Sequence, residues 1–214
     1  MSRTMNASGI VFVVDDDPSV CRALTRLARS VGYRAESFQS ARALLTGADL
    51  TSCPECLLLD LELPDVSGLE LQRVLSAVLP IVFVTGHGDI GKTVDAMRAG
   101  ATDFLPKPVD EAVLLDAIAR ALGRSMQMGA YRREIETIQA RVGRLTPRER
   151  EVMALVVSGR LNKQVADDLG IAEKTIKIHR ARVMEKMEAA SLADLVRLAD
   201  KVGIGAMQNA RALR

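Results

Sequence analysis

Cys56-Leu57-Leu58-Leu59-Asp60 is an uninterrupted apolar run that ends in a carboxylate. A continuously apolar segment of this length is typical of a parallel β-strand that is buried on both faces. In open α/β sheets the functional groups gather at the carboxyl ends of such strands. This one stretch therefore predicts both the fold class of the surrounding chain and a functional position for Asp60.

Three further apolar runs also lead into polar residues. The run 10–14 is followed by Asp15, Asp16 and Asp17, and the run 81–84 is followed by Thr85. The run 103–105 is followed, after Pro106, by Lys107. Because the carboxyl ends of parallel strands meet at one edge of a sheet, we expect these side chains to gather there. Taken singly, each has a simpler interpretation as a cap, a turn residue or a solvated side chain.

Strand-like and helix-like segments alternate over the first 124 residues. The strand-like runs are 10–14, 33–38, 56–60, 81–84 and 103–105, and the helical patterns are 18–31, 40–47, 67–78, 89–99 and 110–122. Five βα units of this kind predict a doubly wound five-stranded parallel sheet with helices on both faces. Past residue 124 no strand-like run appears. The expected fold class is an α/β domain followed by an all-α domain.

Charge is divided unevenly along the chain. Residues 1–124 carry 12 basic and 16 acidic side chains, whereas residues 125–214 carry 17 and 11. A basic C-terminal part is compatible with nucleic acid binding, although a solvated surface is the simpler interpretation. The apolar runs are too short to cross a membrane, and residues 1–8 lack the apolar core of a signal peptide. We therefore expect a cytoplasmic protein without a membrane partner.

The three cysteines, an odd number, argue against a disulfide framework. Cys53 and Cys56 have the spacing of a redox or metal motif. A zinc site needs about four ligands, and the chain has two histidines, so a metal is not expected there. Cys56 fits a buried strand, and a redox role for the pair stays an open alternative.

Residues 125–144 form a predicted linker helix. Apolar residues follow a three-then-four spacing at Met128, Tyr131, Ile135, Ile138, Val142 and Leu145. This spacing fits either a coiled-coil seam between two copies or a helix that packs on its own domain. Gly123 and Gly129 weaken helix continuity, so a rigid signalling helix and a flexible tether are both open.

A second domain is predicted over residues 145–206. Thr146-Pro147-Arg148-Glu149 offers an N-cap, a proline in the first turn and a capping-box glutamate. Asn162 begins a short helix, Gly170 supplies a tight turn, and a new helix begins near Glu173. Two helices joined by such a turn are typical of the helix-turn-helix unit. A last amphipathic helix from Ser191 is predicted to close the core with Leu192, Leu195, Val196 and Leu198.

The acidic strand ends predict phosphoryl chemistry. Carboxylates crowded together raise one another's pKa unless a cation compensates them, so Asp15, Asp16 and Asp60 call for one. Oxygen ligands without a nearby histidine or cysteine favour Mg²⁺ as the cofactor. With Mg²⁺ bound, Asp60 can act as a carboxylate nucleophile toward a phosphoryl group. Thr85 and Lys107 supply the hydroxyl and the ammonium that phosphoryl oxygens need.

These motifs resemble the receiver domain of bacterial response regulators over nearly all of residues 9–124. The resemblance rests on Val13-Val14-Asp15-Asp16-Asp17, Leu57-Leu58-Leu59-Asp60 with Pro64 and Ser67-Gly68, Val84-Thr85-Gly86, and Phe104-Leu105-Pro106-Lys107-Pro108. It implies a CheY-like fold in which a sensor histidine kinase phosphorylates Asp60, and the domain slowly hydrolyses that phosphoryl group. It further implies that Asp15 and Asp16 hold Mg²⁺, that Thr85 and Phe104 form the switch, and that the Lys107-Pro108 bond is cis.

Two positions near the acceptor depart from common residues of that family. Glu62, two residues after Asp60, is expected to offer only its backbone carbonyl to the metal, while its side chain adds negative charge. His87, two residues after Thr85, replaces groups that elsewhere orient water. We hypothesise that both set the dephosphorylation rate, with ordinary exposed residues as the alternative.

The helix that begins at Glu173 is predicted to read DNA. On a helical wheel Ile176, Val183 and Met187 share a stripe that faces the core. The opposite side carries the candidate base-edge contacts Lys174, Lys177, Ile178 and Ala181, and the flanks carry the candidate phosphate contacts Lys163, Thr175, His179, Arg180 and Arg182. The angle of His179 also brings it near the buried stripe.

Residues 145–206 resemble the LuxR-type four-helix DNA-binding domain, most closely in the FixJ branch of the FixJ/NarL-type response regulators. The match rests on Leu145-Thr146-Pro147-Arg148-Glu149, Asn162-Lys163-Gln164 and the segment from Glu173 to Arg180. Ala172 stands where many relatives have a serine cap, a loss of roughly 1 kcal/mol. The resemblance implies a transcription regulator whose phosphorylation promotes dimerisation and promoter binding, with RNA polymerase as a further partner.

Two rival functions are open from the sequence. A phosphohydrolase of the haloacid dehalogenase type also uses an aspartyl nucleophile, but there a second Asp stands two residues further on, where this chain has Glu62. The other rival is a regulator whose receiver domain is never phosphorylated and serves in dimerisation. Phosphorylation of Asp60 is the interpretation that accounts for the whole set of strand-end residues.

Overall fold

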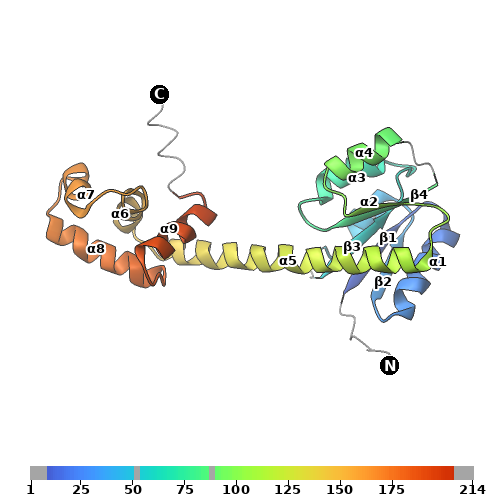
Figure 1. Cartoon of the computed structure of the whole chain (residues 1–214), viewed down its shortest axis with the longest axis horizontal. Coiled ribbons are helices and arrows are strands. Elements are labelled where there is room, and N and C mark those ends of the chain that lie inside the picture. Colours follow the sequence, from blue (N-terminus) through green and yellow to red (C-terminus); the bar gives the residue numbers. More distant parts are fainter. Residues whose placement is uncertain (1–8, 51–53, 87–89, 205–214) are drawn as a thin grey trace. The chain divides into compact units, whose positions relative to one another are not determined.

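The computed structural model describes residues 9–50, 54–86 and 90–204, and it divides into two compact units between Ala130 and Tyr131. The first unit holds β1 (Ile10–Val14), α1 (Pro18–Ser30), β2 (Arg34–Phe38), α2 (Ala41–Gly47), β3 (Glu55–Leu59), α3 (Gly68–Leu75), β4 (Ile81–Thr85), α4 (Ile90–Arg98) and β5 (Asp103–Pro106). Helix α5 (Glu111–Gly143) follows, and α6 (Pro147–Val157), α7 (Asn162–Leu169), α8 (Glu173–Lys186) and α9 (Leu192–Lys201) complete the second unit (Figure 1).

The first unit is built around a parallel sheet with the strand order β2-β1-β3-β4-β5. Its strands keep a register in which Val14 of β1 stands opposite Leu59 of β3. The two strands therefore end at the same level, and the residues that follow them, Asp15 and Asp60, become neighbours. The predicted doubly wound α/β fold is confirmed.

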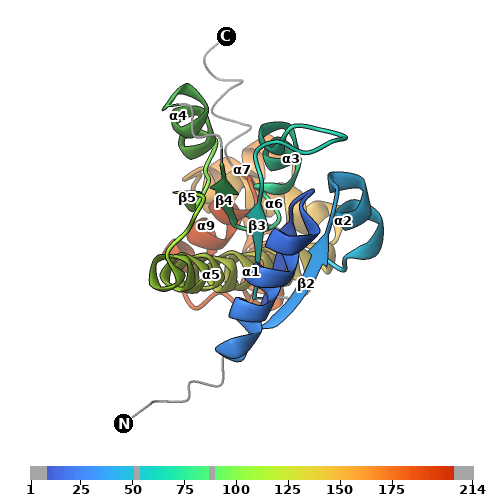
Figure 2. The same cartoon turned by 90° about the vertical axis from the view of Figure 1, so that its right-hand side faces the viewer.

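Both faces of this sheet are buried, which explains the continuous apolar runs. Alternate residues point to opposite faces. One face, with Val11, Val13, Cys56, Leu58, Val82 and Val84, packs against α1 and α5. The other face, with Phe12, Val14, Leu57, Leu59, Ile81 and Phe83, packs against α2, α3 and α4. Figure 2 shows the two helix layers on the two sides of the sheet.

Side-chain caps begin several of these helices where the sequence predicts them. Ser40 accepts a hydrogen bond from the Ala43 N–H, and Ser67 forms a capping box with Glu70. The Asp110 carboxylate accepts from the N–H groups of Ala112 and Val113. Each cap satisfies donors that the first helical turn leaves without partners.

Helix α5 differs from the prediction of a helix that ends near residue 122. It continues through Gly123 and Gly129 to Gly143. A helical glycine costs only about 1 kcal/mol relative to alanine, and the neighbouring residues are good helix formers. The early part of α5 contributes Leu114 and Ile118 to the core of the first unit, and its last turns contribute Ile138 to the second.

The second unit is a small helical domain with its own core. Its buried residues include Ile138, Val152, Met153, Val156, Val165, Ile176, Val183, Met187 and Leu195. Gly170 ends α7 in the left-handed region, at φ 64, as the turn between α7 and α8 requires. Helix α9 turns Leu195 and Ala199 into this core and leaves Leu192 and Val196 each 39% exposed. The prediction that Leu192 and Val196 close the core is therefore wrong.

Polar contacts fix the C-terminal end of α8 within the second unit. Lys186 donates to the buried Glu149 carboxylate at 2.6 Å, and Glu149 also caps the first turn of α6. At the C-terminal end Arg141 donates to the Met187 carbonyl at 3.3 Å and to the Glu188 carboxylate at 2.6 Å. The last turns of α5 are thus part of this domain. Within the described residues no helix combines the length and the apolarity needed to cross a membrane.

Candidate functional site

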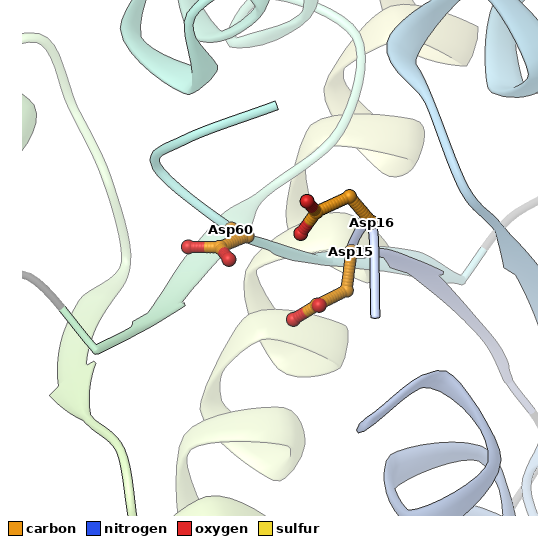
Figure 3. A group of neighbouring side chains, drawn as sticks. All are labelled: Asp15, Asp16 and Asp60. Carbon is orange, nitrogen blue, oxygen red and sulfur yellow. The ribbon is translucent and has the colours of Figure 1, made fainter. Parts of the chain in front are cut away.

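Three aspartates meet where β1 and β3 end. Asp15 and Asp16 follow β1, Asp60 follows β3, and one carboxylate oxygen from each lies within 4.8 Å of the other two. Asp15 and Asp60 are buried, whereas Asp16 is exposed. Figure 3 shows the three carboxylates gathered at this edge of the sheet. The pairing of β1 with β3 brings together residues that are 45 positions apart in the sequence.

Lys107 contacts two of these carboxylates. Its Nζ donates to Asp15 Oδ2 at 2.5 Å and to Asp60 Oδ2 at 3.0 Å. The Lys107-Pro108 peptide bond is cis, and the Lys107 N–H donates to the Thr85 carbonyl at 2.8 Å. One ammonium therefore spans the two carboxylates from a loop that is joined to the end of β4.

The protonation equilibria reflect this crowding. Burial raises the pKa of Asp15 above its usual range, and the hydrogen bonds from Lys107 and from the Asp17 N–H only partly oppose that effect. For Lys107, burial acts to lower the pKa, but the hydrogen bonds to Asp15 and Asp60 outweigh it and raise the pKa. The pocket thus holds the Lys107 ammonium, which stays charged, and the Asp15 carboxylate, whose charged form a further cation would stabilise.

The remaining predicted pocket residues lie on β4 and β5. Thr85 ends β4 with a side chain that is almost fully buried. Phe104, on β5, is half-buried, and its ring centroid lies 5.8 Å from that of Phe83. Thr85 pairs with Pro106 in the sheet, one residue before Lys107. These contacts link the hydroxyl, the aromatic ring and the ammonium through two neighbouring strands.

The donor set fits Mg²⁺. This ion binds oxygen ligands at about 2.0–2.1 Å and is typically held in proteins by one or two carboxylates and several waters. Asp15, Asp16 and Asp60 supply oxygen donors within 4.8 Å of one another, and the exposed Asp16 leaves the group open to water. The raised pKa of Asp15 is consistent with a pocket that a cation would relieve.

The loop after Asp60 contains contacts that the sequence did not predict. Gly68 approaches this loop so closely that a Cβ there would lie 2.4 Å from the Asp60 carbonyl oxygen. Asp65 accepts hydrogen bonds from the Ala41 and Arg42 N–H groups, and the second of these is the main cause of its lowered pKa. The Glu62 carboxylate pairs with Lys92 of α4 at 3.3 Å. No local sequence pattern signals these contacts.

The second unit presents a polar surface on α8. Ile176 and Val183 are buried, and the predicted base-edge residues Lys174, Lys177, Ile178 and Ala181 are exposed. Lys163 and Arg182 are exposed as well. Lys177 forms an ion pair with Glu173 at 3.2 Å. The helix therefore separates a core face from a face that is open to a partner.

The other predicted phosphate contacts are half-buried: Thr175, His179 and Arg180. Arg180 donates to the Asn162 side chain of α7 at 3.0 Å, which fixes its orientation. The Nδ1 atom of His179 is buried and has no hydrogen-bond partner in the described part of the chain. Ala172 provides no side-chain cap for α8, as its residue type predicts.

Two predicted residues cannot be placed, because Cys53 and His87 lie outside the described residues. Cys56 is fully buried in β3, and burial raises the pKa of its thiol far above the usual range. A thiol that is kept protonated in this way is a poor nucleophile. Its structural setting is therefore that of a core residue.

Together, the two units define the class of protein. A doubly wound five-stranded sheet with three carboxylates, a hydroxyl and an ammonium at one edge is a receiver-type domain. The second unit, in which α7 and α8 are joined by the Gly170 turn, is a helix-turn-helix domain.

Comparisons with known proteins identify the family. The sequence profile of the response regulator receiver domain matches residues 11–119, and that of the bacterial regulatory proteins of the luxR family matches residues 143–199. Nodulation protein W of Bradyrhizobium diazoefficiens is 48% identical over 206 residues, which cover 94% of this chain and 89% of that protein. Transcriptional regulatory protein FixJ of Azorhizobium caulinodans is 39% identical, covering 94% of this chain and 96% of that protein.

A solved structure agrees with this assignment. The response regulator StyR superimposes with a TM-score of 0.73 at 45% identity, covering 91% of this chain and 100% of that chain. The chain belongs to the FixJ/NarL-type response regulators, as its motifs indicated. It is a two-component transcriptional regulator with a receiver domain and a LuxR-type DNA-binding domain.

Proposed function

We propose that phosphorylation of Asp60 by a sensor histidine kinase switches this regulator. The observation that carries the proposal is the position of Lys107, whose ammonium contacts both Asp60 and Asp15. An ammonium within 3.0 Å of the Asp60 carboxylate is suited to bind a phosphoryl oxygen once that carboxylate has accepted the group. The residues of the pocket divide the remaining tasks.

Asp60 is the acceptor. One of its oxygens attacks the phosphorus atom of a phosphohistidine, the P–N bond breaks, and its electron pair stays with the imidazole. The other oxygen, Oδ1, accepts the Leu61 N–H at 2.6 Å, which holds the carboxylate in place. Slow attack of water on the same phosphorus later returns Asp60 to its free state, so the domain resets itself.

Mg²⁺ is the proposed cofactor and, when bound, would neutralise charge on the phosphoryl group. Asp15, Asp16, Asp60 and the backbone carbonyl of Glu62 are the proposed ligands. The shared position of the three carboxylates supports this set. Because burial disfavours the charged form of Asp15, a bound cation would stabilise this carboxylate.

The switch is proposed to start at Thr85. Its hydroxyl moves toward the phosphoryl group, and the half-buried ring of Phe104 follows it inward toward Phe83. This change reaches β5, which pairs with β4, and then α4, which packs against β5.

Dimerisation through α4 is the proposed readout. Ile90, Val94 and Met97 recur at helical spacing and are 82%, 40% and 45% exposed, which is unusual for apolar residues on one face of one helix. A dimer would present two copies of α8, and paired half-sites increase both affinity and specificity for DNA.

The domain limits that we propose are a receiver domain over residues 9–124, a linker helix over residues 125–144 and a DNA-binding domain over residues 145–206. Burial of Ile138 and the Arg141–Glu188 ion pair support a linker whose last turns belong with the DNA-binding domain. Promoter DNA would contact Lys174, Lys177, Ile178 and Ala181 through base edges, and Lys163, Thr175, His179, Arg180 and Arg182 through phosphates. RNA polymerase is the further partner of a transcription regulator, and the site of action is the cytoplasm.

The decisive experiment measures the intact mass of the protein after incubation with acetyl phosphate and Mg²⁺, together with its elution volume. We expect a phosphoryl adduct on wild type that requires Mg²⁺, an elution shift toward a dimer, and tighter binding to a DNA site selected from a random pool. Asp60→Asn should form no adduct, whereas Asp200→Asn, a change at an exposed aspartate of α9, should behave as wild type.

A second pair of variants separates the adduct from the dimer. Val94→Asp on α4 should form the adduct and stay monomeric, whereas Val74→Asp on α3, where the valine is 65% exposed, should still dimerise. The absence of an adduct on wild type under all conditions would favour the rival in which the receiver domain is never phosphorylated.

A further inference from the structure

A fourth carboxylate stands beside the acceptor and is paired with a lysine from another element. Glu62 follows Asp60 by two residues, and its Oε1 lies 3.3 Å from Nζ of Lys92 in the first turn of α4. The two side chains are 53% and 44% exposed. Lys92 also lines the surface depression that otherwise consists of residues from Leu61 to Leu69, the segment after the acceptor.

Glu62 adds to the negative charge that surrounds Asp60. A span of two residues places its backbone within about 7 Å of the Asp60 backbone. Asp15, Asp16 and Asp60 already lie together, and Lys107 contacts only two of them. A phosphoryl group carries roughly two negative charges at neutral pH, so each unbalanced carboxylate at this rim opposes its approach.

We propose that Lys92 is a positioning residue for the phosphorylation of Asp60. By pairing with Glu62 it balances this carboxylate and holds it toward α4, which lowers the repulsion against an incoming phosphoryl donor. The inference rests on the proposed function of Asp60 as the acceptor. It assigns Lys92 a role in the rate of phosphoryl transfer and none in the chemical step itself.

The position of the pair separates this role from a structural one. An ion pair between side chains that are half exposed contributes little to folding stability. Without the Lys92 ammonium, however, the Glu62 carboxylate is unbalanced beside a doubly charged donor, so removal of the ammonium should slow phosphorylation by roughly threefold. Salt should weaken the effect, because the screening length falls from about 10 Å at 0.1 M to about 3 Å at 1 M ionic strength.

The test follows the Asp60 adduct over time in the full-length chain with acetyl phosphate, saturating Mg²⁺ and low salt. Lys92→Gln should form the adduct roughly threefold more slowly than wild type, with an unchanged melting temperature. Lys92→Arg should restore the wild-type rate. Glu62→Gln should be at least as fast as wild type, and the double variant should match Glu62→Gln. Lys201→Gln changes the net charge equally and also removes a half-exposed ion pair, that with Glu134, so it serves as the matched control.

The double variant decides whether Lys92 acts through Glu62. A double variant as slow as Lys92→Gln would overturn the inference, and so would a Lys92→Gln rate equal to wild type at low salt. In both cases the adduct on wild type would leave the proposed acceptor function intact. If wild type forms no adduct at all, the acceptor function fails and the role of Lys92 falls with it.

Discussion

Substitution of Gly68 by alanine tests how tightly α3 is fitted against the loop that follows Asp60, the proposed phosphoryl acceptor. A Cβ at this position would lie 2.4 Å from the Asp60 carbonyl oxygen and 3.0 Å from the Leu61 Cα. Normal carbon–oxygen contacts are roughly 3.3 Å or longer, so the backbone would have to move by about 1 Å. The Gly68 N–H, which donates to the Leu61 carbonyl at 2.8 Å, moves with it.

Two opposing terms set the effect on stability. Alanine is favoured over glycine in a helix by about 1 kcal/mol, and overpacking against backbone costs about 1–3 kcal/mol. We therefore expect a net loss of about 1 kcal/mol in the free energy of unfolding of the receiver domain. Displacement of Asp60 should reduce the phosphorylation rate more strongly, by about tenfold or more, because a misplacement of 1 Å costs up to about 10²-fold.

Urea unfolding and adduct formation with acetyl phosphate measure the two quantities on the same samples. Gly123→Ala is the matched control, because Gly123 is also helical and its added Cβ meets nothing within 4 Å. This control should gain about 1 kcal/mol and keep the wild-type phosphorylation rate. A Gly68→Ala protein that is as stable as Gly123→Ala and reacts as fast as wild type would refute the reasoning.

Four further predictions concern the DNA-binding domain. Glu149→Gln should lower the free energy of unfolding of this domain by about 1.5–3 kcal/mol at pH 7. The hydrogen bond from Lys186 lowers the pKa of Glu149, so the difference between variant and wild type should disappear as the pH falls through that pKa. A difference that does not depend on pH would contradict the ion pair of Glu149 with Lys186 as its cause. A fragment of residues 131–214 should unfold cooperatively. A fragment of residues 145–214 should melt at a lower temperature, because it lacks Ile138 and Arg141. Equal melting temperatures would show that the last turns of α5 do not stabilise this domain. Lys177→Ala should cost about 1–3 kcal/mol on selected DNA and relax specificity. Arg180→Ala should weaken binding to all sequences and reduce the salt dependence by about one unit, and identical salt slopes in a titration would exclude a phosphate contact.

The sheet was predictable because its signals are local. An apolar run such as Leu57-Leu58-Leu59 specifies a strand that is buried on both sides, and Ser67 with Glu70 specifies a helix start. The end of α5 was not predictable from Gly123, because a single glycine weakens a helix without ending it. The exposure of Leu192 depends on how α9 rotates against its neighbours, and the apolar pattern leaves that rotation open.

The residues of the candidate site were likewise predictable in part. Asp15, Asp60 and Lys107 were predictable because parallel strands bring their carboxyl ends to one edge. Contacts between elements that are distant in sequence were not. Lys92 pairs with Glu62 across 30 residues, and Gln72 of α3 donates to the Ala96 carbonyl of α4 across 24. Such contacts depend on the packing of whole helices, which no local motif encodes.

Glu188 shows how a strained residue can hold a domain together. It follows α8 at φ 53, in the left-handed region where a residue other than glycine costs about 1–2 kcal/mol. Its carboxylate binds Arg141 at 2.6 Å and lies 3.7 Å from Arg144, both near the end of α5. A protein engineer who relieved the strain with Glu188→Gly would remove the side chain that both arginines hold. Relaxing this turn would loosen α8 at the point where the end of α5 is bound to it.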